Sequence, residues 1–178
     1  MLESDAQIAR SIWGIGGVGK PQIALEYANP RWNSGTLVAL WVSSETEGEV
    51  AKGIREAAQR LQLDGYSKAN TPDKNRLLVL QWLQTTNARW LVIFDNVEDN
   101  KVLIGNQPKA GNGDVLITCR SELFAKPVAM SPIEVTTFST QESRSLIFQI
   151  LSRAAINSEE IQAADFLAEQ LGGLCQVN

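Results

Sequence analysis

The chain of 178 residues contains no histidine and only two cysteines, Cys119 and Cys175. Without histidine it can build no Ser-His-Asp triad, no His-ligated zinc site and no histidine general base. Both cysteines fall in stretches typical of a protein core, so we interpret them as buried free thiols in a reducing compartment. Any catalysis must therefore rely on carboxylates, lysine, arginine or a bound metal.

Long apolar runs and an excess of positive charge are missing as well. No apolar run approaches the roughly 18 residues typical of a membrane-spanning helix, and the first five residues lack the basic region that opens a signal peptide. The formal net charge is −4, which argues against nucleic acid as a partner. We therefore expect one cytoplasmic domain with a sizeable core, without a membrane or nucleic-acid partner.

A glycine-rich stretch over residues 14–20, GIGGVGK, is the clearest motif in the chain. It lies between a predicted strand (8–12) and a predicted helix (20–28), the setting in which G-x-x-x-x-G-K binds phosphate. The glycines let successive backbone N–H groups point at one anion, and the helix adds its positive N-terminal end. Lys20 would supply a charge for the outer phosphates. The predicted nucleotide-binding residues here are Gly14, Gly16, Gly17, Val18, Gly19, Lys20, Pro21 and Gln22.

The residue after this lysine departs from the motif. The motif requires Ser or Thr, whose hydroxyl binds Mg²⁺, but this chain has Pro21. Proline has neither a hydroxyl nor a backbone N–H, although a helix can begin with it. The longer side chain of Gln22, one position further round the helix, is a poor substitute. We therefore expect phosphate binding with a weakened Mg²⁺ site.

Apolar runs and helical periodicities alternate along the rest of the chain. The pattern predicts an α/β protein with three layers, in which helices flank a five-stranded, mainly parallel sheet. Several strands are predicted to be buried on both faces. We also expect four tryptophans to lie in the core or at its edge, namely Trp13, Trp41, Trp82 and Trp90. Further strands are predicted over 36–42, 90–94, 115–118 and 133–135, and further helices over 45–63, from Pro72, from Ser139 and over 158–171.

Local signals mark where these helices begin and end. Asn29-Pro30 is expected to end the first helix, since a residue before proline avoids the helical conformation. Thr71-Pro72 is typical of a helix start, and Leu77, Leu80 and Leu83 are expected to form the buried seam of that helix. Residues 139–142 form an S-x-x-E capping box, and Gly172-Gly173 is expected to end the last helix.

Two charged residues follow predicted strands and would therefore meet the glycine loop at one edge of a parallel sheet. Asp95 is placed to bind Mg²⁺ through water beside the phosphates; the alternative is an aspartate that caps the next segment. Arg120 would reach a γ-phosphate with its fork of donors; the alternative is a surface arginine paired with Glu122. We name Asp95 as the metal ligand and Asp95 and Arg120 as the candidate catalytic residues.

Asn96 occupies the position where many P-loop hydrolases carry a carboxylate. An asparagine can hydrogen-bond the attacking water but cannot take its proton. With Pro21, this residue predicts slow hydrolysis at most. The neighbouring Glu98 and Asp99 are interpreted as a solvated charge cluster.

These residues together resemble the NB-ARC domain of the STAND class of P-loop NTPases, which includes NOD-like receptors. The amino-acid sequence of the loop and of the helix after it is most similar to that of fungal members. The similarity covers nearly the whole chain. Its segments, in family order, are IWGIGGVGK (12–20), IALEYA (23–28), LWV (40–42), the Walker B strand (90–96), the sensor segment LITCR (116–120) and LGGL (171–174).

The resemblance implies an ATP/ADP switch, held closed by ADP and opened by ATP for oligomerisation and signalling in immunity or regulated cell death. It implies that the glycine loop and Lys20 hold phosphates, that Asp95 serves Mg²⁺ and that Arg120 senses the γ-phosphate. The sequence departs from the family at Pro21 and at Cys175, which replaces a proline near adenine. Little chain precedes residue 8 and the chain stops at Asn178, so we expect residues 1–178 to be one nucleotide-binding core without winged-helix, repeat or effector domains. This core would be either a fragment of a longer protein or a very short member of the family.

Three hypotheses follow. The first is a nucleotide switch domain with weak or no hydrolysis, which also associates with itself or with protein partners. The second is a degenerate P-loop module that binds no nucleotide usefully and acts through protein contacts. The third is an active metabolic NTPase or kinase, for which the sequence offers neither a catalytic carboxylate nor a substrate site.

Overall fold

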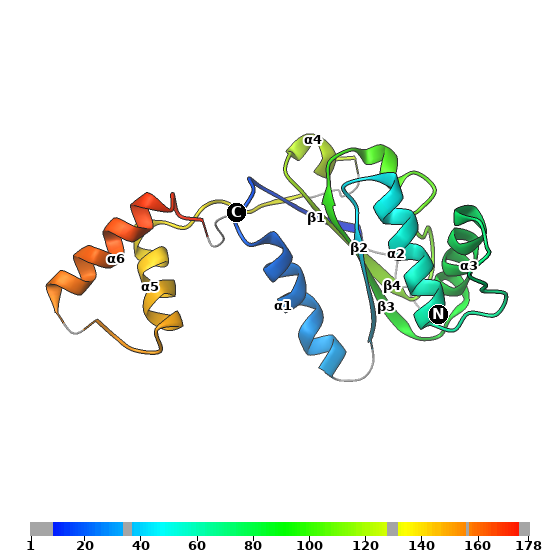
Figure 1. Ribbon diagram of the computed structural model, residues 1–178, viewed down its shortest axis with the longest axis horizontal. Helices are drawn as coiled ribbons and strands as arrows, with labels where there is room; N and C mark the ends of the chain where they lie inside the picture. Colours follow the sequence, from blue (N-terminus) through cyan, green and yellow to red (C-terminus); the bar gives the residue numbers. More distant parts are fainter. Residues whose placement is uncertain (1–8, 34–36, 128–131, 156, 175–178) are drawn as a thin grey trace, which may run out of the picture.

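The computed structural model describes residues 9–33, 37–127, 132–155 and 157–174. Strands and helices alternate through most of this range (Figure 1). Two short elements, η1 and α4, were not predicted from the sequence pattern. The elements are β1 (Ala9–Trp13), α1 (Lys20–Asn33), β2 (Leu37–Ser43), α2 (Glu47–Arg60), α3 (Pro72–Thr85), β3 (Arg89–Val97), η1 (Asn100–Leu103, a 3₁₀-helix), β4 (Gly113–Cys119), α4 (Glu122–Ala125), β5 (Ile133–Glu134), α5 (Thr140–Ile150) and α6 (Ser158–Gln170).

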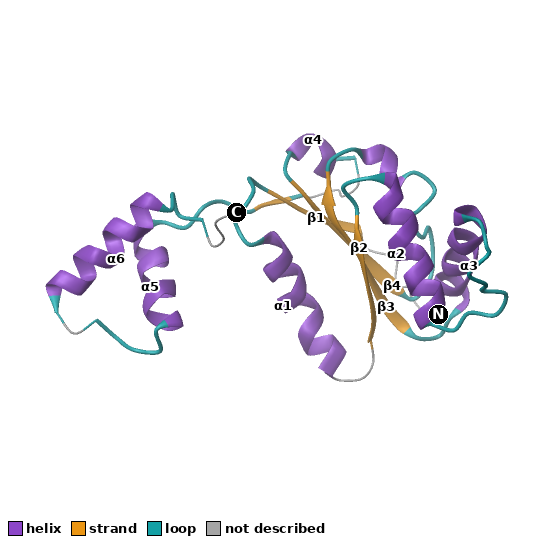
Figure 2. Ribbon diagram, in the orientation of Figure 1, coloured by secondary structure: helices purple, strands orange, loops and turns teal. Residues whose placement is uncertain are grey.

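The five strands form one sheet in the order β2-β3-β4-β1-β5, and every pairing is parallel. α1 covers one face, and α2 and α3 cover the other (Figure 2). The predicted fold, a five-stranded parallel sheet flanked by helices, is therefore confirmed. Because all strands are parallel, their carboxyl ends meet at one edge of the sheet.

The larger core lies between the sheet and the helices α2 and α3. Thr71 is the N-cap of α3, with Pro72 at its first position, as predicted. The seam of α3 was only partly predicted, because Leu77 is 62% exposed whereas Val79 and Leu83 are buried. Of the three predicted leucines, Leu83 is buried and Leu80 is half-buried, so the prediction is wrong at Leu77 alone. The predicted core position of Cys119 is confirmed: it is a buried free thiol in this core, while Cys175 lies outside the described residues.

The opposite face of the sheet packs against α1 through two small residues. Ala24 and Ala28 are buried against β1, β3 and β4, and small side chains there allow a close approach of helix and sheet. The predicted end of α1 at Asn29-Pro30 is wrong, since the helix continues to Asn33. Proline disfavours but does not forbid a helical residue before it, and here it removes one N–H near the last turn.

Two strands are less buried than predicted. Arg10 in β1 is exposed, so this strand is buried over Ser11 and Ile12 and not along its whole length. β2 lies at the edge of the sheet, where Trp41 is 39% exposed and Val42 is buried. An edge strand has a neighbour on one side only, and its side chains are correspondingly less covered.

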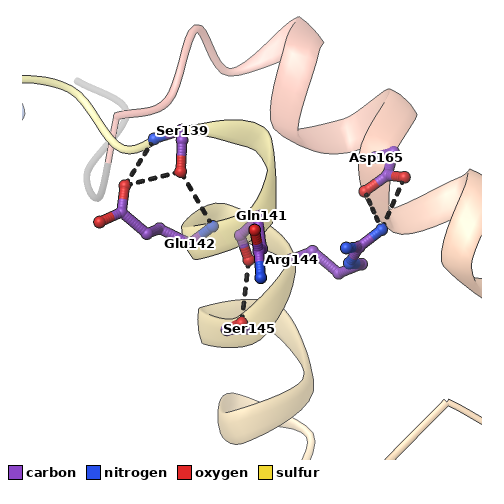
Figure 3. Close-up of polar contacts among 6 residues, drawn as sticks. All are labelled: Ser139, Gln141, Glu142, Arg144, Ser145 and Asp165. Carbon is purple, nitrogen blue, oxygen red and sulfur yellow. Dashed lines mark hydrogen bonds and ion pairs between the residues drawn. The ribbon is translucent and has the colours of Figure 1, made fainter.

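The helices α5 and α6 form a hairpin that lies apart from the sheet (Figure 1). The predicted capping box is present, with Ser139 and Glu142 bonded to each other's backbone N–H groups, and Arg144 joins the two helices through an ion pair of 2.9 Å to Asp165 (Figure 3). The predicted glycine end of α6 is also confirmed, because Gly172 and Gly173 both have positive φ angles. Among the described helices, none is long and apolar enough to cross a membrane.

Trp90 provides a test of the larger core. It is fully buried, and its indole N–H donates to the Leu83 carbonyl in the last turn of α3 at 2.8 Å. Trp90→Phe leaves that carbonyl without its donor, so we expect the free energy of unfolding to fall by about 1–3 kcal/mol. The control Trp41→Phe at the exposed edge should cost less than about 1 kcal/mol. Equal losses for the two variants in urea denaturation would contradict this account of the core.

Candidate functional site

A pocket of about 230 Å³ lies at the carboxyl edge of the sheet. It collects residues from four places, namely the loop after β1, the start of α1, the end of β3 and the end of β4. These segments meet because β4 lies between β1 and β3 in the sheet. The lining residues are Gly16, Gly17, Gly19, Lys20, Pro21, Asp95, Asn96, Thr118 and Arg120.

The glycine loop owes its conformation to backbone freedom at specific positions. Gly17 and Gly19 have φ angles of 83° and 88°, in the left-handed region that side chains disfavour. Gly14 is needed for a different reason, because a Cβ there would lie 2.2 Å from the Val135 carbonyl oxygen. A Cβ at Gly16 would meet no atom within 4 Å. The pocket is therefore open above Gly16, as a site approached by a phosphate requires.

Lys20 is the central cation of the pocket and is only 6% exposed. Its ammonium donates to the carbonyl oxygens of Gly14 at 2.7 Å and Ile15 at 2.9 Å, which uses two of its three donors. Burial lowers the pKa of Lys20, and the charge of Arg120 lowers this pKa as well, while Cys119 and Asp95 act in the opposite direction. A phosphate in the pocket would supply the negative charge that such a buried ammonium needs.

Pro21 is the second residue of α1 and lines the pocket. The helix forms around it without difficulty, because the first helical hydrogen bond runs from the Ile23 N–H to the Gly19 carbonyl at 3.0 Å. The N–H groups of the first helical turn have no acceptor within the helix, so a proline there removes no helical hydrogen bond. Pro21 thus keeps the fold of the loop but brings neither a donor nor a hydroxyl to the pocket.

Asp95 and Asn96 occupy the end of β3, beside Thr118 of β4. The Thr118 hydroxyl donates to Asp95 Oδ1 at 2.6 Å and accepts the Asn96 N–H at 2.8 Å. The alternative role of Asp95 as a cap is wrong, because Asp99 is the N-cap of η1. No role for Thr118 was predicted from the sequence, where its one available signal is a hydroxyl after the apolar residues 115–117.

Arg120 follows β4 directly and lies at the rim of the pocket. Its side chain pairs with Glu98 at 3.6 Å, and both side chains are substantially exposed. The predicted alternative pairing with Glu122 is wrong, because Glu122 pairs with Lys126 at 3.0 Å. An exposed ion pair of this kind contributes at most about 1 kcal/mol. Arg120 can therefore exchange Glu98 for a phosphate at little cost.

The structure thus brings most of the predicted site residues together. Gly16, Gly17, Gly19, Lys20, Pro21, Asp95 and Arg120 line the pocket, whereas Gly14, Val18 and Gln22 do not. Gly14 lies beneath the loop against the strand-end backbone, the side chain of Val18 is buried, and Gln22 is exposed on α1.

The pocket residues fit a phosphate chain better than they fit a free metal ion. Within the described residues, no group of three or more His, Cys, Asp or Glu side chains is arranged to hold a metal. A Mg²⁺ at Asp95 would therefore take most of its oxygen ligands from phosphates and water. The glycine backbone, Lys20 and Arg120 provide the donors and positive charge that phosphates need.

A second pocket, also of about 230 Å³, lies at the first turns of α2 and α3 and extends to η1. It has no glycine loop, and its charges are mixed, with Glu47 and Asp73 beside Arg76 and Lys101. Asp73 and Arg76 already pair with each other at 3.0 Å. Its mixed charges provide no concentration of positive groups that would bind a phosphate chain, so the pocket at the glycine loop is the better candidate for the functional site.

Comparison with known proteins agrees with this geometry. The family model of the NB-ARC domain matches residues 1–157. A nucleotide-binding leucine-rich repeat (NLR)-like protein of the fungus Hyaloscypha variabilis is 27% identical over 164 residues, which cover 91% of this chain and 16% of that relative. The chain therefore spans less than a fifth of the length of the curated relative it matches.

Solved structures share the fold at low sequence identity. A STAND protein with a tetratricopeptide repeat sensor from Pyrococcus horikoshii has a TM-score of 0.53 at 16% identity, covering 96% of this chain and 26% of that chain. The ORC2 protein of Aeropyrum pernix in its ADP form has a TM-score of 0.63 at 12% identity, covering 94% and 53%. Cdc6p of Pyrobaculum aerophilum has a TM-score of 0.60 at 9% identity, covering 92% and 56%.

Two glycines of the loop should respond differently to alanine. Gly14→Ala forces a methyl group against the Val135 carbonyl, so we expect the free energy of unfolding to fall by about 1–3 kcal/mol. Gly16→Ala meets open space and should stay within about 1 kcal/mol of the natural chain. Thermal and urea unfolding without nucleotide measure both. A Gly16→Ala variant that loses as much stability as Gly14→Ala would contradict the loop conformation described here.

Proposed function

Because the chain belongs to the NB-ARC domain family, we propose that it is the nucleotide-binding core of an NLR-type signalling protein and works as an ATP/ADP switch. Residues 1–178 form one nucleotide-binding domain in this proposal. The observation that carries it is the single pocket in which the glycine loop, Lys20, Asp95 and Arg120 meet.

The residues of the pocket divide the work of holding a nucleotide. The backbone of the glycine loop and the start of α1 receive the phosphate chain. Lys20 moves from the carbonyls of Gly14 and Ile15 to the outer phosphates, and Arg120 leaves Glu98 for the γ-phosphate. Because ADP lacks that phosphate, Arg120 distinguishes ATP from ADP. Asp95 would hold Mg²⁺, and the ion would neutralise phosphate charge when bound.

Hydrolysis is slow or absent in this proposal. Pro21 gives Mg²⁺ no hydroxyl ligand, so the ion is held less tightly than in a P-loop with threonine at this position. Asn96 lines the pocket where a general base would act, but an amide cannot accept the proton of the attacking water. At most the domain is a slow ATPase, and its output comes from which nucleotide is bound.

The biological setting follows from the family alone. An NLR-type switch of the cytoplasm would act in immunity or regulated cell death, by self-association or through protein partners, with no role for membrane or nucleic acid. The net charge of −4 agrees with the last point, because a nucleic-acid partner requires a basic surface.

The alternative is a degenerate P-loop module that acts through protein contacts only. One observation favours it: the hairpin of α5 and α6 exposes several large apolar side chains, among them Ile150 at 72% and Phe166 at 61%. Such residues are typical of surfaces that another protein covers. Nucleotide titration decides between the two functions.

Calorimetric titration of ADP and ATP, with and without Mg²⁺, tests the switch. We expect micromolar binding by the natural chain with little effect of Mg²⁺. Pro21→Thr restores the hydroxyl and one N–H, and it should raise the affinity for Mg²⁺-ATP about tenfold, since one charge-assisted hydrogen bond is worth about 1.5–3 kcal/mol.

Two variants control this titration. Pro72→Thr makes the same exchange in the first turn of α3, away from the glycine loop, and should leave the affinities unchanged. Gly16→Ala should weaken ADP and ATP alike, because its methyl group enters the space above the loop. Binding by Pro21→Thr alone would favour the degenerate module, and binding by neither chain would contradict the proposed switch.

A further inference from the structure

The pairing of β3 with β4 changes at the edge of the pocket. The regular parallel register runs up to the pair Phe94–Ile117, and the next pair is Val97–Cys119. Between these pairs β3 has two residues, Asp95 and Asn96, whereas β4 has one, Thr118. This is a β-bulge, a feature that re-aims side chains and is frequent beside active sites.

The Thr118 hydroxyl replaces the backbone bond that the bulge interrupts. It accepts the Asn96 N–H at 2.8 Å and donates its own hydrogen to Asp95 Oδ1 at 2.6 Å. Asn96 has a φ of 59°, in the left-handed region that asparagine tolerates better than most residues. One side chain thus holds both an unusual backbone turn and the orientation of a carboxylate.

The bulge is held from its other side as well. The Ser44 N–H, just beyond β2, donates to the Asp95 carbonyl at 2.8 Å. Thr118 is 1% exposed, so its hydroxyl is largely shielded from solvent. Within the described part of the chain, the Thr118 hydroxyl is the side-chain donor that bonds the Asp95 carboxylate, and this bond limits rotation of the carboxylate about its own bonds.

We propose that Thr118 is a positioning residue, which aims the Asp95 carboxylate at the metal position of the phosphate pocket and fixes the bulge at Asn96. This inference rests on the proposed nucleotide-binding function. The hydroxyl uses one carboxylate oxygen, Oδ1, so that Oδ2 would be available to hold the metal. The methyl group of Thr118 plays no part in this role, so serine can replace threonine but valine cannot.

Amide hydrogen exchange tests the structural half of the proposal without any nucleotide. In Thr118→Val the Asn96 amide loses its acceptor and should exchange at least about tenfold faster than in the natural chain. Thr118→Ser should keep most of the protection. The control Thr85→Val removes a hydroxyl that bonds the Gln81 carbonyl in α3 and should leave the Asn96 amide unchanged. Equal protection in Thr118→Val and the natural chain overturns the proposal.

The gain in ATP affinity on adding Mg²⁺ tests the functional half. The Pro21→Thr background gives a large gain to measure. In that background we expect Thr118→Val to reduce the gain about tenfold beyond any change in metal-free affinity, while Thr118→Ser and Thr85→Val keep it. A Thr118→Val chain that keeps the gain, or that loses metal-free affinity to the same extent, overturns the proposal. Absence of ATP binding in both the natural and the Pro21→Thr chains would instead reject the proposed function, and the exchange result on Asn96 would stand by itself.

Discussion

The place of β4 between β1 and β3 is the constraint on which the whole pocket depends. A parallel sheet brings the ends of its strands to one edge, but only neighbouring strands bring their last residues into contact. With β4 in the middle, Thr118 reaches Asp95 on one side, and Arg120 follows at the mouth of the glycine loop. If β1 and β3 were adjacent, β4 could not supply the hydroxyl between them.

In this structure the protein itself supplies hydrogen-bond or ion-pair partners for both cations of the pocket. Lys20 is bonded to two loop carbonyls, and Arg120 is paired with Glu98. A nucleotide would therefore exchange partners at both cations instead of meeting unpaired charges. The exchange at Lys20 involves a buried group, whereas that at Arg120 breaks an exposed ion pair of small energy. In the proposed switch, Lys20 would contribute to binding any nucleotide, whereas Arg120 would respond to one phosphate.

Much of the fold followed from local signals that the sequence carries openly. The strand–loop–helix order around the glycines, the Thr71-Pro72 start of α3 and the capping box at Ser139 depend on residues close in sequence. The parallel sheet then predicts that Asp95 and Arg120 approach the loop. Predictions from such local signals are correct where the backbone preference of the residues agrees with the tertiary structure.

The errors arose where distant residues decide the outcome. Leu77 is exposed because the sheet and α2 bury a different side of α3, and α1 continues through Pro30 although this proline removes one helical N–H donor. Arg120 pairs with Glu98 across the pocket mouth and not with Glu122 two positions away. The bulge at Asn96 depends on the hydroxyl of Thr118, 22 positions later in the chain, and a local sequence pattern cannot predict such a distant contact.

The central claim is that the ends of β1, β3 and β4 form one phosphate site. The most direct measurement is a map of amide NMR shifts of the natural chain during titration with ADP. We predict the largest shifts at Gly16, Gly17, Gly19 and Lys20, with smaller shifts at Asn96 and Arg120. Shifts that gather instead around Ala51 and Arg76, at the second pocket, or that are spread evenly over the surface would contradict the claim.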